Sequence, residues 1–392
     1  MSRRPDKQDV ATRLIHAVSG PSLSDRTVGP PVVRGSTVLM PNAASLYATD
    51  RPTYGRAGLA VQTTLCEALA EMEGASGCRL FSSGLAAMTG SLLAVLRAGD
   101  ELLVADSVYA PTRRFCDKVL NRLGIKVGYY PPRATADEIL ARAGTTLRAI
   151  VLESPGSLTF EIQDVAAIAA SASQRGVLTV MDNTWAAGLL FQPLAHGVDI
   201  SVQALTKYVC GHSDVFAGSA CAKDPALVTA LDEAIWNFGW AVSPDDAYQA
   251  LRGLRTLTTR MARHGESGLA LARWLQGQPQ VARVLYPALP GDDDHALWLR
   301  DFSGACGLIG VVLKPAPDRA VNALLDGLSL FGLGFSWGGF ESLAISCDPQ
   351  LAGRRHQPDL GGPLIRLHVG LEDPADLIAD LQRGLAAFDT AK

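Results

Sequence analysis

The sequence has little net charge and contains no run of lysine and arginine. Its formal net charge is −4 over 392 residues, of which 48% are hydrophobic and 19% charged, as is typical of a soluble globular protein. Binding to nucleic acid or to an anionic membrane requires a basic cluster, so neither partner is indicated. Small molecules are therefore the predicted ligands.

Long apolar runs and paired cysteines are also missing. No window reaches the length of a membrane span, and the start MSRRPDKQDVATRLIH lacks the apolar region of a secretion signal, so we expect a cytoplasmic protein. The seven cysteines are scattered and never spaced C-x-x-C. This pattern fits reduced thiols better than a disulfide framework or a zinc site, and no metal is expected.

The character of the sequence changes twice along the chain. Residues 1–58 are rich in Pro, Gly, Arg and Ser and predict an extended arm, which we expect to contact a neighbouring subunit. Residues 59–245 alternate short apolar strands with amphipathic helices, which predicts an α/β domain with a mostly parallel sheet. Residues 246–392 open with a long helical pattern over 245–277 and predict a smaller α+β domain. The strands expected in the first domain cover 78–81, 100–106, 148–154, 176–182 and 199–205.

Unusual polar residues follow these strands, at the edge where ligands bind in such sheets. Ser83 and Gly84 lie where the first strand runs into a helix, whose N-terminus can hold a phosphate. Tyr109, Asp182 and Lys207 each follow a later strand. Each has an ordinary alternative, because a serine before a helix is most often a cap, an aspartate can cap a turn, and a lysine can be a solvated charge.

Taken together, these residues supply the parts that pyridoxal 5′-phosphate needs. A lysine forms a Schiff base with its aldehyde, a carboxylate keeps the pyridine nitrogen protonated, and N–H and hydroxyl groups hold the phosphate. An aromatic ring such as that of Tyr109 can stack on the pyridine. The combination predicts a site for this cofactor at the carboxyl edge of the sheet.

Six motifs strengthen this interpretation because they occur in order along nearly the whole chain. They are YGRAG at 54–58, LESPGS at 152–157, MDNTWAAG at 181–188, ALTKYVCGHSD at 204–214, SWGGFESL at 336–343 and LIRLHVGLED at 364–373. Together they resemble the cysteine/methionine-metabolism family of PLP-dependent enzymes, and so many ordered motifs are more specific than any single one. The resemblance implies the fold-type I, PLP-dependent transferase-like architecture.

The resemblance also implies roles for residues of the first domain and the arm. Lys207 would form the Schiff base and move the Cα proton, Asp182 would pair with the pyridine nitrogen, and Tyr109 would stack on the ring and assist catalysis. The remaining cofactor contacts are expected from Ser83, Gly84, Leu85, Thr184 and Thr206, and, reaching in from an adjacent subunit, from Tyr54 and Arg56.

Substrate contacts are implied in the second domain. Arg366 matches the position that grips the substrate α-carboxylate, a task suited to its two-pronged guanidinium, although a surface arginine on a strand is otherwise common. Ser336 and Trp337 are expected beside it, and Tyr54 of the arm is expected to contact the substrate as well. A homotetramer built from dimers with shared active sites is the implied assembly.

The sequence leaves three possible functions open, two enzymatic and one not. The first is α,β-elimination, which converts L-cystathionine and water to L-homocysteine, pyruvate and ammonia in methionine biosynthesis. The second is a γ-acting or broader carbon–sulfur enzyme of the same family; such relatives tend to carry an acidic residue before Ser-Leu-Gly-Gly, where this chain has Phe335 before SWGG. The third is a non-catalytic regulator, which predicts a missing lysine or aspartate, yet Lys207 and Asp182 are present.

Overall fold

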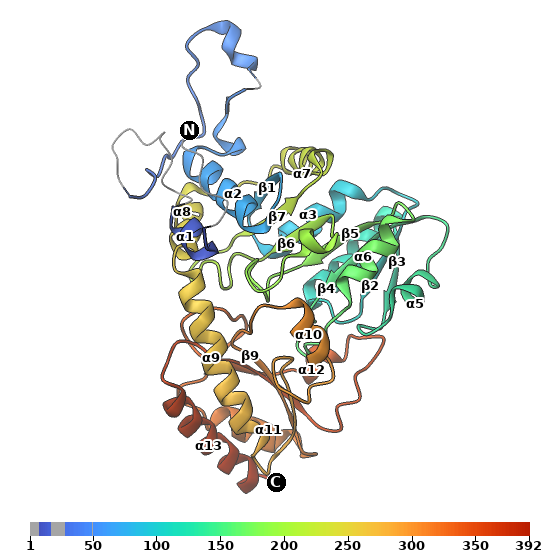
Figure 1. Cartoon of the computed structure of the whole chain (residues 1–392), viewed down its shortest axis with the longest axis vertical. Helices are drawn as coiled ribbons and strands as arrows, with labels where there is room; N and C mark the ends of the chain where they lie inside the picture. The colour runs from blue at the N-terminus through green and yellow to red at the C-terminus, as the bar shows by residue number, and fades with distance from the viewer. Residues whose placement is uncertain (1–7, 17–27, 49) are drawn as a thin grey trace.

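Two β-sheets organise the chain, one formed within residues 77–222 and the other within 281–368 (Figure 1). In this computed structural model residues 8–16, 28–48 and 50–392 are described; residues 1–7, 17–27 and 49, all part of the predicted arm, lie outside them. Among the described residues, no helix combines the length and the apolar character that membrane crossing requires.

The larger sheet has seven strands in the order β1-β7-β6-β5-β4-β2-β3. They are β1 (Gly77–Phe81), β2 (Glu101–Ala105), β3 (Lys126–Tyr130), β4 (Leu147–Glu153), β5 (Leu178–Asp182), β6 (Ile200–Gln203) and β7 (Gly218–Ala222). Neighbours pair in parallel except around β7, which is antiparallel to β1 and to β6. The predicted α/β fold with a mostly parallel sheet is confirmed, and five of the strands lie where the sequence predicts them.

Two strands of this sheet, β3 and β7, are absent from the prediction. The β7 segment GSACA has only small side chains, so it carries little of the β-branched signal by which strands are recognised. Its smallness has a packing reason, because a Cβ on Gly218 would lie 2.3 Å from the carbonyl oxygen of Ser83. At Gly218, at least, the small residue is required by the close approach of the loop before α3 rather than by local propensity.

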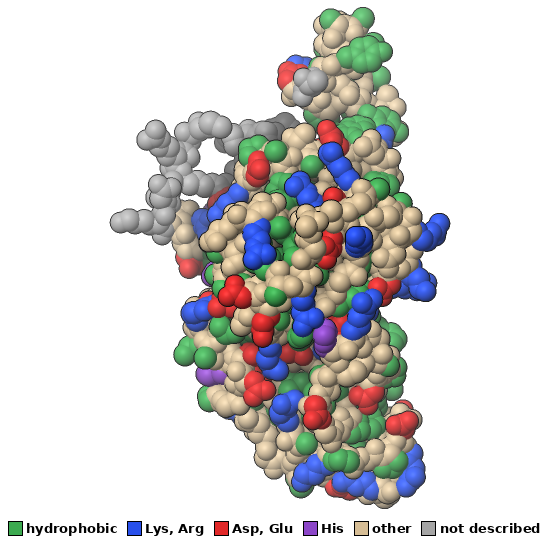
Figure 2. Space-filling view, turned by 90° about the vertical axis from the view of Figure 1, so that its right-hand side faces the viewer, with side chains coloured by type: hydrophobic (Ala, Val, Ile, Leu, Met, Phe, Trp, Pro, Cys, Tyr) green, Lys and Arg blue, Asp and Glu red, His purple; other side chains and the backbone are tan. Residues whose placement is uncertain are grey.

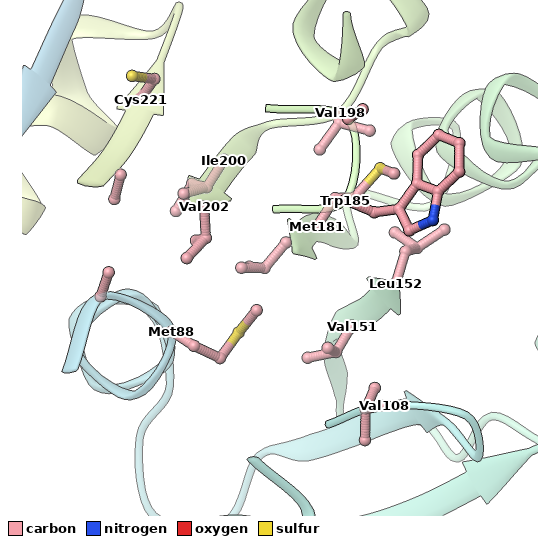
Figure 3. Close-up of a cluster of buried hydrophobic side chains, with 14 of the residues drawn as sticks. Met88, Val108, Val151, Leu152, Met181, Trp185, Val198, Ile200, Val202 and Cys221 are labelled. Carbon is pink, nitrogen blue, oxygen red and sulfur yellow. The ribbon is translucent and has the colours of Figure 1, made fainter. Parts of the chain in front are cut away.

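Helices cover both faces of this sheet. They are α2 (Ala60–Glu73), α3 (Gly84–Val95), α4 (Ala110–Phe115), α5 (Ala136–Leu140), α6 (Val165–Ser173), α7 (Pro225–Phe238) and α8 (Pro244–Leu254), with the short helices η3 (Cys116–Leu120), η4 (Asn121–Leu123) and η5 (Pro193–His196). Figure 3 shows Met88 of α3 pointing toward Val151 of β4, Met181 of β5 and Val202 of β6, all of them buried. This core fixes the strand ends relative to the start of α3.

The second sheet has the order β10-β11-β12-β9-β8 and is mostly antiparallel. Its strands are β8 (Val281–Leu285), β9 (Leu308–Leu313), β10 (Gly332–Leu333), β11 (Leu343–Ser346) and β12 (Leu364–His368); the helices of this part are α9 (Leu257–Gln276), α10 (His295–Asp301), α11 (Asp318–Asp326), α12 (Asp348–Leu351) and α13 (Pro374–Thr390). An α+β arrangement was expected here.

The long helical pattern over 245–277 is broken into α8 and α9. At the break, the carbonyl of Gly253 accepts hydrogen bonds from the Thr256 N–H at 3.1 Å and from Arg260 Nη2 at 2.8 Å. These donors satisfy a carbonyl that the helix end leaves free. The predicted boundary after residue 245 falls inside α8, and the division into an arm and two domains stays a prediction.

The described part of the arm contains α1 (Val10–His16), η1 (Ala43–Tyr47) and η2 (Gly55–Ala57). Figure 1 shows the segment around η1 extending away from the body at the top of the view, and its side chains are exposed, with 90% of both Leu39 and Tyr47 accessible. The same segment stands out in Figure 2, where Lys and Arg are interspersed with Asp and Glu over the visible face. Neither sign of charge gathers on that face.

Candidate active site

A cavity of about 330 Å³ opens at the carboxyl ends of β4, β5 and β6, where α3 begins. Residues 337 and 366 of the second half of the chain form part of its wall, so the site lies where the two halves meet. Of the residues predicted for the site, the structure brings together around this cavity Ser83, Gly84, Leu85, Tyr109, Asp182, Thr184, Thr206, Lys207, Trp337 and Arg366.

Lys207 lies in the turn that follows β6 and is half-buried. Its Nζ donates a hydrogen bond to Ser336 Oγ at 2.7 Å and lies 5.4 Å from the centre of the Trp337 ring. Burial, helped by the positive charge of Arg366, lowers the pKa of the Lys207 ammonium to about 8, while Asp182 opposes the change. The neutral fraction of this amine near pH 7 is therefore far larger than that of an ordinary lysine, which makes it a usable nucleophile and base.

Asp182 ends β5, and Thr184 holds its carboxylate. The carboxylate accepts hydrogen bonds from the Thr184 N–H at 3.0 Å and from Thr184 Oγ1 at 2.5 Å. Burial raises the pKa of Asp182, whereas these two donors and the charge of Lys207 act in the opposite direction. A cationic ring nitrogen inside the cavity would satisfy this carboxylate by a charge-assisted hydrogen bond.

The start of α3 forms the polar floor of the cavity. Ser83 caps this helix, its hydroxyl accepting from the Ala86 N–H at 3.0 Å, so that Gly84 and Leu85 occupy the first turn. The first N–H groups of a helix lack helical acceptors and attract anions. Gly84 is required there, because a Cβ would lie 2.3 Å from the Cβ of Ala204. The floor therefore suits a phosphate group.

Thr206 also lines this floor, but its hydroxyl is engaged with Ala217. Oγ1 donates to the Ala217 carbonyl and accepts from the Ala217 N–H, both at 3.1 Å. A phosphate would have to compete with that carbonyl for the Thr206 proton. The predicted contact requires the hydroxyl hydrogen to turn toward the cavity.

Arg366 of β12 is only 8% exposed, and Ser336 anchors it. Its Nη2 donates to the Ser336 carbonyl at 2.7 Å, whereas its Nε is buried without a hydrogen-bond partner among the described residues. Burial lowers the pKa of this guanidinium. A buried cationic donor without an acceptor is costly, and a carboxylate ligand would supply that acceptor.

Ser336 itself does not line the cavity, yet its hydroxyl meets Lys207 and its carbonyl meets Arg366. Its φ of +90° is rare for a residue other than glycine and is held by these contacts. Two residues further on, Gly338 has a φ of +86°, and a Cβ there would lie 3.0 Å from the Cα of Lys207. The 336–339 loop thus packs directly on the backbone of the lysine.

Tyr54 and Arg56 are not at this cavity in the single chain. Arg56 donates to the Trp236 carbonyl at 3.1 Å and stacks over the Trp236 ring at 4.5 Å, beside a second pocket of about 250 Å³. Tyr54 is 44% exposed. Their contact with the site of a neighbouring subunit stays a prediction.

Glu153 and Ser157 also line the cavity and are missing from the prediction, although the quoted motif LESPGS contains them. Glu153 ends β4, directly opposite Asp182 of β5. The rule that placed Asp182 at a strand end applies equally to Glu153, so the signal was available.

The residues around the cavity fit pyridoxal 5′-phosphate. The cofactor carries an anionic phosphate, a basic ring nitrogen and an aldehyde, and the cavity offers a helix N-terminus, the half-buried carboxylate of Asp182 and a lysine with a lowered pKa. Because Ser83, Gly84 and Leu85 line the cavity, an anion inside it can approach the first N–H groups of α3.

Three comparisons agree with this chemistry. The family model described as Cys/Met metabolism PLP-dependent enzyme matches residues 11–386. A cystathionine beta-lyase of Bordetella avium is 43% identical over 96% of this chain and 97% of its own length, and the cystathionine beta-lyase MetC of Escherichia coli strain K12 is 44% identical over 85% of each. The crystal structure of a cystathionine gamma synthase of Xanthomonas oryzae pv. oryzae in complex with cystathionine has a TM-score of 0.91 at 31% identity, covering 98% of this chain and 100% of that one.

Proposed function

The chain belongs to the Cys/Met metabolism PLP-dependent enzymes, and from this premise we propose that it is a carbon–sulfur β-lyase that cleaves L-cystathionine. Pyridoxal 5′-phosphate is its cofactor. The observation that carries the proposal is the position of Lys207, whose amine enters the cavity beside Asp182 with its pKa lowered to about 8.

The reaction is an α,β-elimination: L-cystathionine and water give L-homocysteine, pyruvate and ammonia. The Cα–H and Cβ–S bonds break, and when bound the cofactor accepts the electron pair released at Cα. Lys207 Nζ removes the Cα proton, and its hydrogen bond to Ser336 Oγ directs it within the site. Arg366 holds the substrate carboxylate through its fork of N–H groups, of which the Nε–H has no acceptor among the described residues. Asp182 keeps a cationic ring nitrogen in place.

Cleavage at Cβ is favoured over cleavage at Cγ by the residue that precedes Ser336. Phe335 is 80% exposed and stands where γ-acting relatives tend to carry an acid. A carboxylate there would attract the distal ammonium group of cystathionine and turn Cγ toward the cofactor, whereas a phenyl ring offers no such charge. Identity with the two β-lyases, 43% and 44%, also exceeds the 31% identity with the γ-synthase.

The assembly is proposed to be a cytoplasmic homotetramer built from dimers that share active sites. Val28, Leu39 and Tyr47 of the arm expose between 82% and 90% of their surface in the single chain. Apolar side chains presented in this way are commonly covered by a partner. In that assembly Tyr54 and Arg56 would reach the phosphate of a neighbouring site.

Two measurements test the function. Borohydride reduction of the loaded enzyme should fix the cofactor to the peptide that contains Lys207, as peptide mapping would show. In a separate sample that has not been reduced, incubation of the loaded enzyme with L-cystathionine should give pyruvate and homocysteine, with little 2-oxobutyrate. Attachment at another lysine would overturn the site assignment, whereas 2-oxobutyrate as the main product would overturn the β assignment alone.

A further inference from the structure

The carboxyl group of Glu153 is the buried acid of the cavity to which the proposed reaction assigns no role. Glu153 is 9% exposed and lines the cavity wall at the end of β4. Its Oε2 accepts the backbone N–H of Tyr109 at 2.7 Å, and its Oε1 lies 2.5 Å from Ser157 Oγ. One carboxyl thus connects the end of β4 to the segments that follow β2 and β4.

The hydrogen bond from the Tyr109 N–H to Glu153 helps to fix the backbone of a residue whose carbonyl also accepts from the Arg113 N–H at 3.1 Å. Tyr109 stands immediately before α4, and its side chain is 45% exposed beside the cavity. The direction of its ring depends on the backbone at this position, because χ1 turns about the Cα–Cβ bond. A fixed backbone N–H therefore narrows the positions that the ring can take.

Two carboxyl groups side by side cannot both be ionised at low cost. Glu153 and Asp182 are opposite one another on adjacent parallel strands. Burial, and then the charge of Asp182, raise the pKa of Glu153 to about 8, while Ser157, Tyr109 and Arg354 act in the opposite direction. Asp182 has Lys207 and the two Thr184 donors to stabilise its charge. The negative charge therefore belongs on Asp182 and the proton on Glu153.

We infer that Glu153 is a positioning residue that works as a neutral acid, holding the Tyr109 backbone and the Ser157 hydroxyl at the cavity wall without placing a second negative charge beside Asp182. As a neutral acid it accepts from the Tyr109 N–H through Oε2. Ser157 Oγ donates to Oε1 when Glu153 is an ionised carboxylate, and a proton on Oε1 reverses this hydrogen bond so that Ser157 Oγ accepts. The Ser157 proton is then free for a ligand in the cavity. This inference rests on the proposed function, since the ring of Tyr109 matters only if a cofactor stacks against it.

A glutamine is the isosteric mimic of that neutral acid. In Glu153→Gln the amide oxygen can accept from Tyr109 N–H and the amide nitrogen can donate to Ser157 Oγ, whereas Glu153→Ala removes both contacts. A matched control is Glu73→Gln, which alters another buried carboxyl that lies at the end of α2, contacts β6 and does not line the cavity.

The first readout is the dissociation constant of pyridoxal 5′-phosphate, measured by fluorescence titration of the full chain freed of cofactor. We expect Glu153→Gln and Glu73→Gln to stay within about threefold of the unaltered chain and Glu153→Ala to bind about tenfold more weakly, as the loss of one or two hydrogen bonds predicts. Equal weakening by Gln and Ala would show that the ionised form is needed. An alanine variant within threefold of the unaltered chain would remove the positioning role.

The second readout is thermal stability as a function of pH, which requires neither catalysis nor cofactor binding. If Glu153 is neutral in the folded chain, the unaltered protein should lose thermal stability relative to Glu153→Gln as the pH rises from about 5 to 8, because only the unfolded chain ionises this group there. A difference in unfolding temperature between the unaltered protein and Glu153→Gln that stays constant across this pH range would overturn the inference. Failure of the unaltered chain to bind the cofactor or to release pyruvate would instead refute the proposed function, and the stability comparison would still report on Glu153.

Discussion

The cavity and the arm differ in how far a single chain completes them. At the cavity, Lys207, which follows β6 of the larger sheet, donates from its Nζ to Ser336 Oγ, near the smaller sheet, at 2.7 Å. Arg366 of the smaller sheet is only 8% exposed. In the arm, Tyr54 is 44% exposed and Arg56 rests on Trp236, away from the cavity. Groups for the ring and for the reacting atoms are thus assembled within one chain, whereas the arm would supply its groups only to a neighbour. Substitutions at the cavity should therefore impair the chain that carries them, whereas substitutions in the arm should act more weakly and impair the site of a neighbouring subunit.

The largest effect is expected from Lys207→Ala. Removing the amine should lower kcat/KM for L-cystathionine by on the order of 10⁴ or more, because the nucleophile and the base are lost together. Pyruvate release measures the change. The cofactor should still bind without a covalent bond, since the first turn of α3 and Asp182 are untouched. Turnover near that of the unaltered enzyme would refute the site assignment.

Arg366→Lys should have the next largest effect. A lysine replaces a fork of two parallel hydrogen bonds by one point charge, so KM should rise by about 10- to 100-fold with a smaller change in kcat. Steady-state kinetics with L-cystathionine would show the split. Arg300→Lys is a matched control, because Arg300 pairs with Asp164 and Asp301 on the surface. Lowered kcat at constant KM would move the carboxylate site elsewhere.

Arg56→Ala tests the arm and should act more weakly. We expect about tenfold weaker cofactor binding, as the loss of one charged phosphate contact predicts. Arg51→Ala is the control, since that arginine pairs with Asp50 in the same arm.

Mixing then separates the arm from the cavity. Oligomers formed from Arg56→Ala and Lys207→Ala chains should regain part of the activity, because one hybrid site receives an intact arm and an intact lysine. No recovery in verified mixed oligomers would mean that the arm serves its own subunit, and the contrast with the cavity would disappear.

The sequence revealed those parts of the site that depend on strand ends. Asp182 and Lys207 could be found because each follows an apolar strand, and Arg366 because its motif resembles the family. The two contacts of Ser336 could not be predicted, since they depend on a φ of +90° and on the meeting of two distant segments. The strand β7 was missed because its small residues carry little β-propensity, and the need for Gly218 shows only against the distant carbonyl of Ser83.

Glu73→Gln should change catalysis least. It sharpens the comparison of the cavity with the arm because Glu73 is a buried carboxyl that belongs to neither. Glu73 accepts hydrogen bonds from Gln203, at the end of β6, and from Ser201 Oγ at 2.9 Å. Burial raises the pKa of Glu73 to about 7, against the effect of these two donors. Its folded pKa thus exceeds the unfolded value, so the neutral acid favours folding at low pH and this contribution is lost as the pH rises toward 7.

A glutamine retains both partners without the titration, since its amide oxygen can accept from Gln203 and its amide nitrogen can donate to Ser201. The variant should therefore gain stability relative to the unaltered chain between about pH 4.5 and 7, by up to about 3 kcal/mol at neutral pH if the whole shift is realised. Thermal unfolding across this range measures the difference, and pyruvate release should be unchanged because Glu73 does not line the cavity. A fall in kcat with constant stability would instead make Glu73 part of the support of Lys207, acting through Gln203 and the turn that follows β6.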